Sequence, residues 1–102
     1  MAAHEARMIR GRILRILDFA YPEGLALTMI GLTLADMEYA VSPALVSGYI
    51  DYLEEKGYVE THEAKADELG LSRRIAKLTA KGKDLLEGNI AADPGVNLEA
   101  EH

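Results

Sequence analysis

The sequence contains no cysteine, only three prolines among its 102 residues, and no apolar run that approaches the length of a membrane span. The absence of cysteine excludes disulfide bonds, thiol chemistry and the strongest class of structural zinc site. The first ten residues lack the hydrophobic stretch of a signal peptide. We therefore expect a cytoplasmic protein that makes no contact with a membrane.

Basic residues are also scarce. Eleven lysines and arginines stand against 17 aspartates and glutamates, which gives a formal net charge of −6. Half of this excess lies in residues 91–102, which contain Asp93, Glu99 and Glu101 and no basic residue. Non-specific DNA affinity depends on neutralising phosphates with lysine and arginine, so this composition argues against a general polyanion binder.

Patterns that carry catalysis or bind metals are missing as well. His4, His62 and His102 have no partner at metal-ligand spacing, and the sequence has neither a glycine-rich phosphate loop nor a G-x-S-x-G elbow. Adjacent carboxylates at Asp67 and Glu68 fall in a predicted loop, where such pairs are usually solvated. We expect no enzymatic activity, no metal and no cofactor.

The pattern that is present is organised around residues 41–59. Ser42 is a suitable helix N-cap, and Pro43 follows at a position where a helix needs no donor. Apolar residues at helical spacing then form one stripe, made by Val46, Ile50 and Leu53. Gly57 can adopt the left-handed conformation that ends a helix, and an extended segment begins directly after it.

The flanking segments complete a small domain at residues 1–90. We predict helices over residues 4–20 and 29–39, separated by a short strand within residues 25–28 that ends at a possible N-cap, Thr28. Strands are predicted at residues 58–62 and 73–78, joined by a long, mobile connection over residues 63–72. Thr79 is predicted to cap a last helix over residues 80–87, and residues 91–102 to form a disordered or loosely docked acidic tail.

This order predicts a mainly α fold with a small β-hairpin, a winged helix-turn-helix arranged as helix-strand-helix-helix-strand-strand-helix. Four segments carry a resemblance: LADM at residues 34–37, VSP at 41–43, YLEEKGYV at 52–59 and LTAKG at 78–82. They resemble the corresponding parts of MarR-, PadR- and ArsR-type transcriptional regulators. The LTAKG segment and the later Pro-Gly-Val at residues 94–96 are also similar to small winged-helix proteins of Mu-like prophages.

The resemblance implies a sequence-specific, phage- or prophage-encoded regulator that binds double-stranded DNA through a recognition helix and a β-wing. Gly48 and Asp51 stand on the exposed helix face where such regulators commonly carry hydrogen-bond donors. Position within the fold could still gather the wing cations toward the DNA. The residues expected to contact DNA are Ser42, Ala44, Ser47, Tyr52, Lys65, Arg73 and Arg74.

A second interpretation is a protein–protein interaction module within a phage replication or transposition complex, without specific DNA binding. In this case the acidic central helix and its tyrosines would form the surface for a phage protein partner. Under either interpretation we expect a homodimer through the first and last helices, because Met8, Leu14 and Phe19 are apolar positions that require cover.

Overall fold

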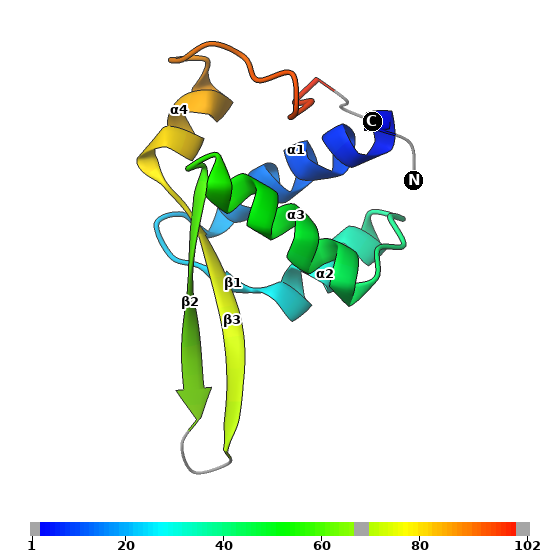
Figure 1. Ribbon diagram of the computed structural model, residues 1–102, viewed down its shortest axis with the longest axis vertical. Coiled ribbons are helices and arrows are strands. Elements are labelled where there is room, and N and C mark those ends of the chain that lie inside the picture. The colour runs from blue at the N-terminus through cyan, green and yellow to red at the C-terminus, as the bar shows by residue number, and fades with distance from the viewer. Residues whose placement is uncertain (1–2, 67–69, 100–102) are drawn as a thin grey trace.

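The computed structural model describes residues 3–66 and 70–99 of the chain (Figure 1). The described elements follow one another as predicted: a helix, a short strand, two helices, a two-stranded wing and a last helix. Their bounds are α1 (Ala3–Ala20), β1 (Leu25–Ala26), α2 (Leu27–Asp36), α3 (Pro43–Glu55), β2 (Val59–Ala66), β3 (Leu71–Leu78) and α4 (Ala80–Glu87). Within the described ranges, no helix is both long and apolar enough to cross a membrane.

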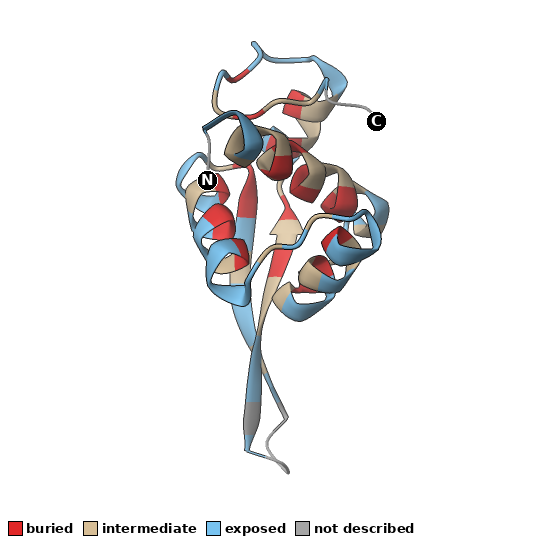
Figure 2. Cartoon of the chain, turned by 90° about the vertical axis from the view of Figure 1, so that its right-hand side faces the viewer, coloured by how far each residue is buried: buried red, intermediate tan, exposed pale blue. Residues whose placement is uncertain are grey.

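Helix α1 is the centre of the hydrophobic core. Its inner face buries Ile9, Ile13 and Leu17 almost completely, and it contacts α2, α3, α4 and β3. Figure 2 shows that the buried residues lie on the inner faces of the helices and at the end of the wing next to them, while the outer faces of the helices are largely exposed. Burial of this continuous apolar surface is the main stabilising contribution to the fold.

The helix ends follow the local signals in the sequence. The hydroxyl oxygen of Ser42 accepts a hydrogen bond from the Leu45 amide, and that of Thr79 accepts one from the Gly82 amide. Gly57 and Gly88 have φ angles of 85° and 77°, the left-handed conformation that glycine adopts without steric cost. The predicted bounds of α3 and α4 are therefore confirmed.

Helix α2 begins earlier and ends earlier than predicted. It starts at Leu27, directly after β1, and its N-cap residue Ala26 makes no side-chain capping bond, so Thr28 is not the cap. It ends at Asp36 because Glu38 has a φ of 71° and the Tyr39 amide turns back to the Leu34 carbonyl. Met37, which the predicted helix over residues 29–39 included, consequently lies at the C-cap of α2 and is exposed.

The sheet has the antiparallel order β1-β3-β2. Its wing strands are longer than predicted, because Glu63 pairs with Arg74 and Lys65 with Ser72, within the segment that we expected to be a long connection. Both faces of this part of the wing project into solvent, so its side chains lack the apolar alternation that reveals a strand. The rest of the predicted mobile tip, residues 67–69, lies outside the described residues.

The segment after α4 returns across the body to α1. Val96 is buried in the core, the Asn97 amide donates to the Arg7 carbonyl, and the Arg10 guanidinium donates to the Gly95 carbonyl. Gly11 permits this approach, since a Cβ at that position would lie 2.1 Å from the Asn97 carbonyl oxygen. The described part of the tail is therefore packed on the helices, while a domain boundary near residue 90 stays a prediction.

One of the three apolar residues expected to require cover in a dimer is already buried in the single chain. Leu14 is fully buried within its own chain, because the face of α1 that it occupies is covered by the other elements of the domain. Met8 is half-buried, and only Phe19, which is 95% exposed, remains a fully uncovered apolar side chain on α1.

Candidate nucleic-acid interface

The exposed face of α3 changes in character along the helix. Its first half presents uncharged residues, which are the small Ala44, Gly48 and half-buried Ser47 together with the exposed Leu45. Its second half presents carboxylates, at Asp51, Glu54 and Glu55. The N-terminus of a helix carries a partial positive charge, so the neutral half is also the half whose backbone favours an anion.

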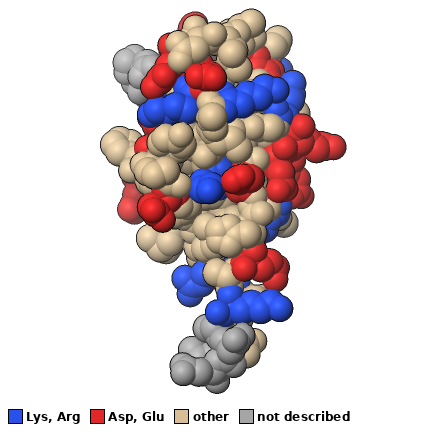
Figure 3. Space-filling view, turned by 90° about the vertical axis from the view of Figure 1, so that its left-hand side faces the viewer, with Lys and Arg blue, Asp and Glu red and all other residues tan. Residues whose placement is uncertain are grey.

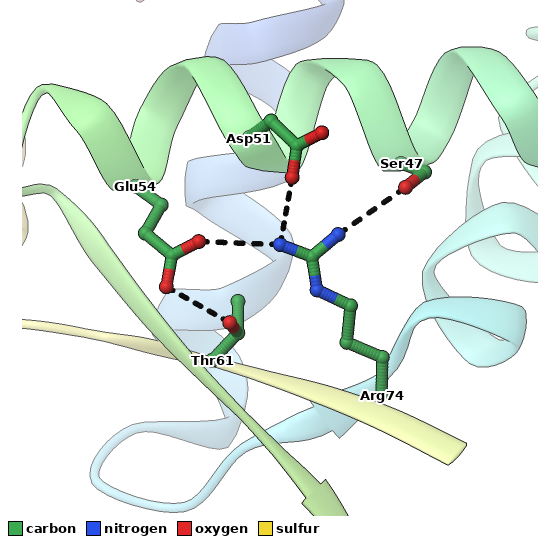
Figure 4. A network of polar contacts seen from close by, with 5 residues as sticks. All are labelled: Ser47, Asp51, Glu54, Thr61 and Arg74. Carbon is green, nitrogen blue, oxygen red and sulfur yellow. Dashed lines mark hydrogen bonds and ion pairs between the residues drawn. The ribbon is translucent and has the colours of Figure 1, made fainter. Parts of the chain in front are cut away.

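A wing arginine binds the acidic half of α3 (Figure 4). The guanidinium of Arg74 donates to the Ser47 hydroxyl at 3.2 Å, to the Asp51 carboxylate at 2.7 Å and to the Glu54 carboxylate at 3.2 Å. Glu54 also accepts a hydrogen bond from the Thr61 hydroxyl of β2 at 2.8 Å. The network fixes the wing against α3 and offsets two negative charges, so Arg74 acts here as a positioning residue.

The strand register separates the cations of the wing. Side chains alternate between the two faces of a strand, and directly paired residues share a face. Lys65 pairs with Ser72 and therefore lies on the same face as Arg74, which is the face directed at α3. Arg73 pairs with Ala64 and lies on the opposite face. The three wing cations expected to contact DNA are thus not gathered at one place.

Tyr52 lies on the other flank of α3. The Arg10 guanidinium stacks on its ring, 3.8 Å from the centroid, and its hydroxyl lies beside Gly95 of the tail. Stacking of arginine on an aromatic ring is attractive because the face of the ring is electron-rich. Tyr52 therefore joins α3 to α1 and the tail, away from Ser42, Ala44 and Ser47.

The charges of the surface are mixed. Figure 3 shows lysine and arginine side chains in a band across the upper body and again near the end of the wing, with acidic side chains among them. Residues 25–55, which form β1 and the helix-turn-helix α2–α3, contain five acidic residues and no lysine or arginine. Cations that could meet a phosphate backbone must therefore come from outside β1, α2 and α3.

A buried carboxylate at the tail was missed by the sequence analysis. Asp93 is 9% exposed and accepts hydrogen bonds from the Tyr58 hydroxyl at 2.6 Å and the Gly95 amide at 2.8 Å, with Lys56 Nζ at 3.1 Å. Burial alone would raise the pKa of Asp93, but the bonds from Tyr58, Gly95 and Lys56 outweigh it and hold the pKa below its ordinary value. The only feature of the local sequence that indicated an ordered structure at Asp93 was the Asp-Pro-Gly turn sequence.

The same cluster explains the titration of its tyrosine. Burial, followed by the hydrogen bond to Asp93, raises the pKa of Tyr58 to about 12. The hydroxyl therefore stays protonated and available as a donor throughout the physiological range. Neither this cluster nor any other within residues 3–66 and 70–99 brings together three metal-binding side chains.

Comparison with known proteins supports the architecture. No protein family model and no curated protein matches this chain. Among solved structures, it is similar to the crystal structure of a PadR family transcription regulator from hypervirulent Clostridium difficile, with a TM-score of 0.66 and 20% sequence identity over 79% of this chain and 81% of that chain. An identity this low establishes the fold alone. The chain has a winged helix-turn-helix fold of the kind found in a PadR family regulator.

Proposed function

We propose that this protein is a DNA-binding transcription regulator that places the first half of α3 in the major groove and the wing along the phosphate backbone. The observation that carries the proposal is the neutral, small-residue surface of α3 next to the wing face that bears Lys65. Small side chains let the helix approach the base edges closely, and the positive end of the helix favours phosphate oxygens.

Six of the seven predicted contact residues have a distinct part in this proposal, and Tyr52, on the other flank of α3, has none. Ser42 and Ser47 reach base edges or phosphates through their hydroxyls, and Ala44 provides apolar contact. Lys65 contacts phosphates on the α3 side of the wing, and Arg73 contacts them from its other face. Arg74 holds the wing in place and reduces the repulsion between Asp51 and DNA.

Assembly as a homodimer would present two recognition helices to two half-sites. A dimer contact on α1 would bury Phe19, whose side chain is 95% exposed in the single chain. A phage origin has narrower support, namely the resemblance of the Leu-Thr-x-x-Gly and Pro-Gly-Val segments to prophage proteins, and it stays a prediction.

The test is a titration of the protein against duplex fragments of its own operon and against a random duplex of equal length, at low salt. We expect tighter binding to one operon fragment and a strong dependence of this binding on salt, because lysine and arginine contacts to phosphates release counterions. The double variant Lys65→Gln, Arg73→Gln should reduce the slope of log K against log salt by roughly 2. Lys81→Gln, on α4, is the control for loss of a cation outside the wing. Equal affinity for operon and random DNA would overturn the proposal.

A second candidate function is a protein–protein interaction module, which the charge of the helix-turn-helix favours. A DNA reader gains affinity from cations on this unit, whereas residues 25–55 carry five acids and no cation. A measurable operon complex that is lost on the double substitution would decide for DNA. No complex at any salt concentration would decide for the interaction module.

A further inference from the structure

An apolar groove lies between α2 and the start of α3. Its volume is about 440 Å³, and the residues that line it are Leu27, Thr28, Gly31, Leu32, Val41, Pro43 and Val46. All of these are apolar or small, apart from the single hydroxyl of Thr28. The groove can accept aliphatic side chains, and its floor adjoins the core, because Val46 belongs to the core cluster and Leu27 and Val41 pack against it.

The segments that form the groove also expose large hydrophobic side chains. Large hydrophobic side chains are exposed on α2, on the turn that follows it and in the first turn of α3, at Met29, Leu32, Met37 and Leu45. Leu32 both lines the groove and is 61% exposed. An exposed apolar surface that continues into a groove indicates a docking site more strongly than scattered surface residues do.

The charge around the groove has one sign. Asp36 follows Leu32 by one helical turn and therefore lies on the same face of α2, and Glu38 is exposed in the turn between the helices. Asp51, further along α3, is paired with Arg74 and is not available to a ligand. Since residues 25–55 provide no lysine or arginine, Asp36 and Glu38 would complement a basic ligand.

We propose that the α2–α3 groove binds a short amphipathic segment of a partner protein, which inserts aliphatic side chains into the groove and directs lysines or arginines toward the surrounding carboxylates. This is the helix-in-groove mode of recognition, with apolar anchors spaced at helical intervals and charged residues beside them. The apolar groove supplies affinity, and the acidic surroundings select the charge of the partner.

Under the proposed function, the groove overlaps the surface of α3 that contacts DNA. Pro43 and Val46 line the groove and belong to the half of α3 proposed to enter the major groove. A segment seated there would occlude that half of the helix. Partner binding and DNA binding would therefore compete, and the partner would release the regulator from DNA.

The probe for the test is a 14-residue, N-acetylated peptide of leucine and lysine arranged at helical spacing, with a twin in which glutamate replaces lysine. The full chain, labelled with ¹⁵N, is titrated with each peptide and followed by NMR. We expect saturable shifts at Gly31, Leu32 and Val46 with the lysine peptide and none with the glutamate twin. This readout needs no DNA, so its outcome is independent of the proposed function.

A pair of matched variants distinguishes insertion of apolar side chains into the groove from electrostatic attraction of the peptide alone. Leu32→Asp removes an apolar anchor but adds a negative charge, and we expect it to weaken binding of the lysine peptide about tenfold. Ile90→Asp makes the same change at an exposed apolar residue outside the groove, and should leave affinity unchanged. Circular dichroism tests whether each variant is folded. If Leu32→Asp is unfolded, Met29→Asp is used in its place.

Three outcomes would overturn the proposal. Equal or tighter binding of the lysine peptide to Leu32→Asp would show that charge alone attracts it. Shifts spread over the acidic surface without saturation at the groove would show the same. Groove shifts that depend on protein concentration in the absence of peptide, with matching self-association in sedimentation, would identify a second copy of the chain as the occupant.

Discussion

The hydroxyl of Tyr58 donates a 2.6 Å hydrogen bond to the carboxylate of Asp93, across 35 residues of sequence. Tyr58 begins the wing segment and Asp93 belongs to the tail, so this contact joins the two ends of the β2-β3-α4 unit. Lys56 adds an ion pair at 3.1 Å to the same carboxylate. The tail is thereby fixed by a satisfied buried charge in addition to the apolar contact of Val96.

Replacement of this carboxylate should change the dependence of stability on pH. The pKa of Asp93 is held below its ordinary value of 3.8, so its contribution is present above that value and is lost as pH falls through the lowered folded-state pKa. Asp93→Asn should destabilise the fold at pH 7 by about 1–3 kcal/mol. Urea unfolding from pH 7 to pH 2 should show this difference shrinking below about pH 4. A difference that stays constant with pH would contradict the assignment.

Two glycine substitutions should act in opposite directions. Gly11→Ala would place a methyl group 2.1 Å from the Asn97 carbonyl oxygen, so we expect a loss of about 1–3 kcal/mol or release of the tail. Gly48→Ala is the control, because a Cβ there meets no atom within 4 Å and alanine is the better helix former. It should stabilise α3 by up to about 1 kcal/mol. Urea unfolding, with limited proteolysis of the tail, measures both.

The Arg74 network should contribute modestly to stability. Asp51 and Glu54 are partly exposed, so solvent screens their attraction to Arg74. Arg74→Gln should reduce the free energy of unfolding by roughly 0.5–1 kcal/mol. Asp51→Asn should cost stability in the wild type but cost nothing, or stabilise, in the Arg74→Gln background, because one carboxylate no longer repels another. Additive effects in the double-mutant cycle would show that the contact is not formed in solution.

The dimer contact can be tested at a single residue. Phe19→Ser removes the exposed aromatic side chain of α1 without disturbing the core, since the residue is 95% exposed in the single chain. We expect the wild type to self-associate at tens of micromolar and the variant to shift toward the monomer in sedimentation equilibrium. Ile90→Ser is the control at another exposed apolar residue. A monomeric wild type would remove the dimer from the proposal.

Much of the fold follows from local signals. Ser42 with Pro43 and Thr79 with Gly88 mark helix ends through hydrogen bonds within a few residues, so their bounds are readable before the fold is known. The wing strands were underestimated because Glu63 and Lys65 are paired through the backbone and show no apolar period. The start of α2 was predicted too far along the chain, because its N-cap residue Ala26 makes no side-chain capping bond.

The order of elements and the acidic helix-turn-helix can be read from the residues alone, since periodicity, caps and charge are properties of neighbouring residues. Which charged groups meet depends on how the elements pack. Arg74 reaches Asp51 across 23 residues, Asp93 reaches Tyr58 across 35, and Arg73 is turned to the other face of the wing by strand register. Such pairings depend on packing between distant segments, and neither composition nor spacing along the chain encodes them directly.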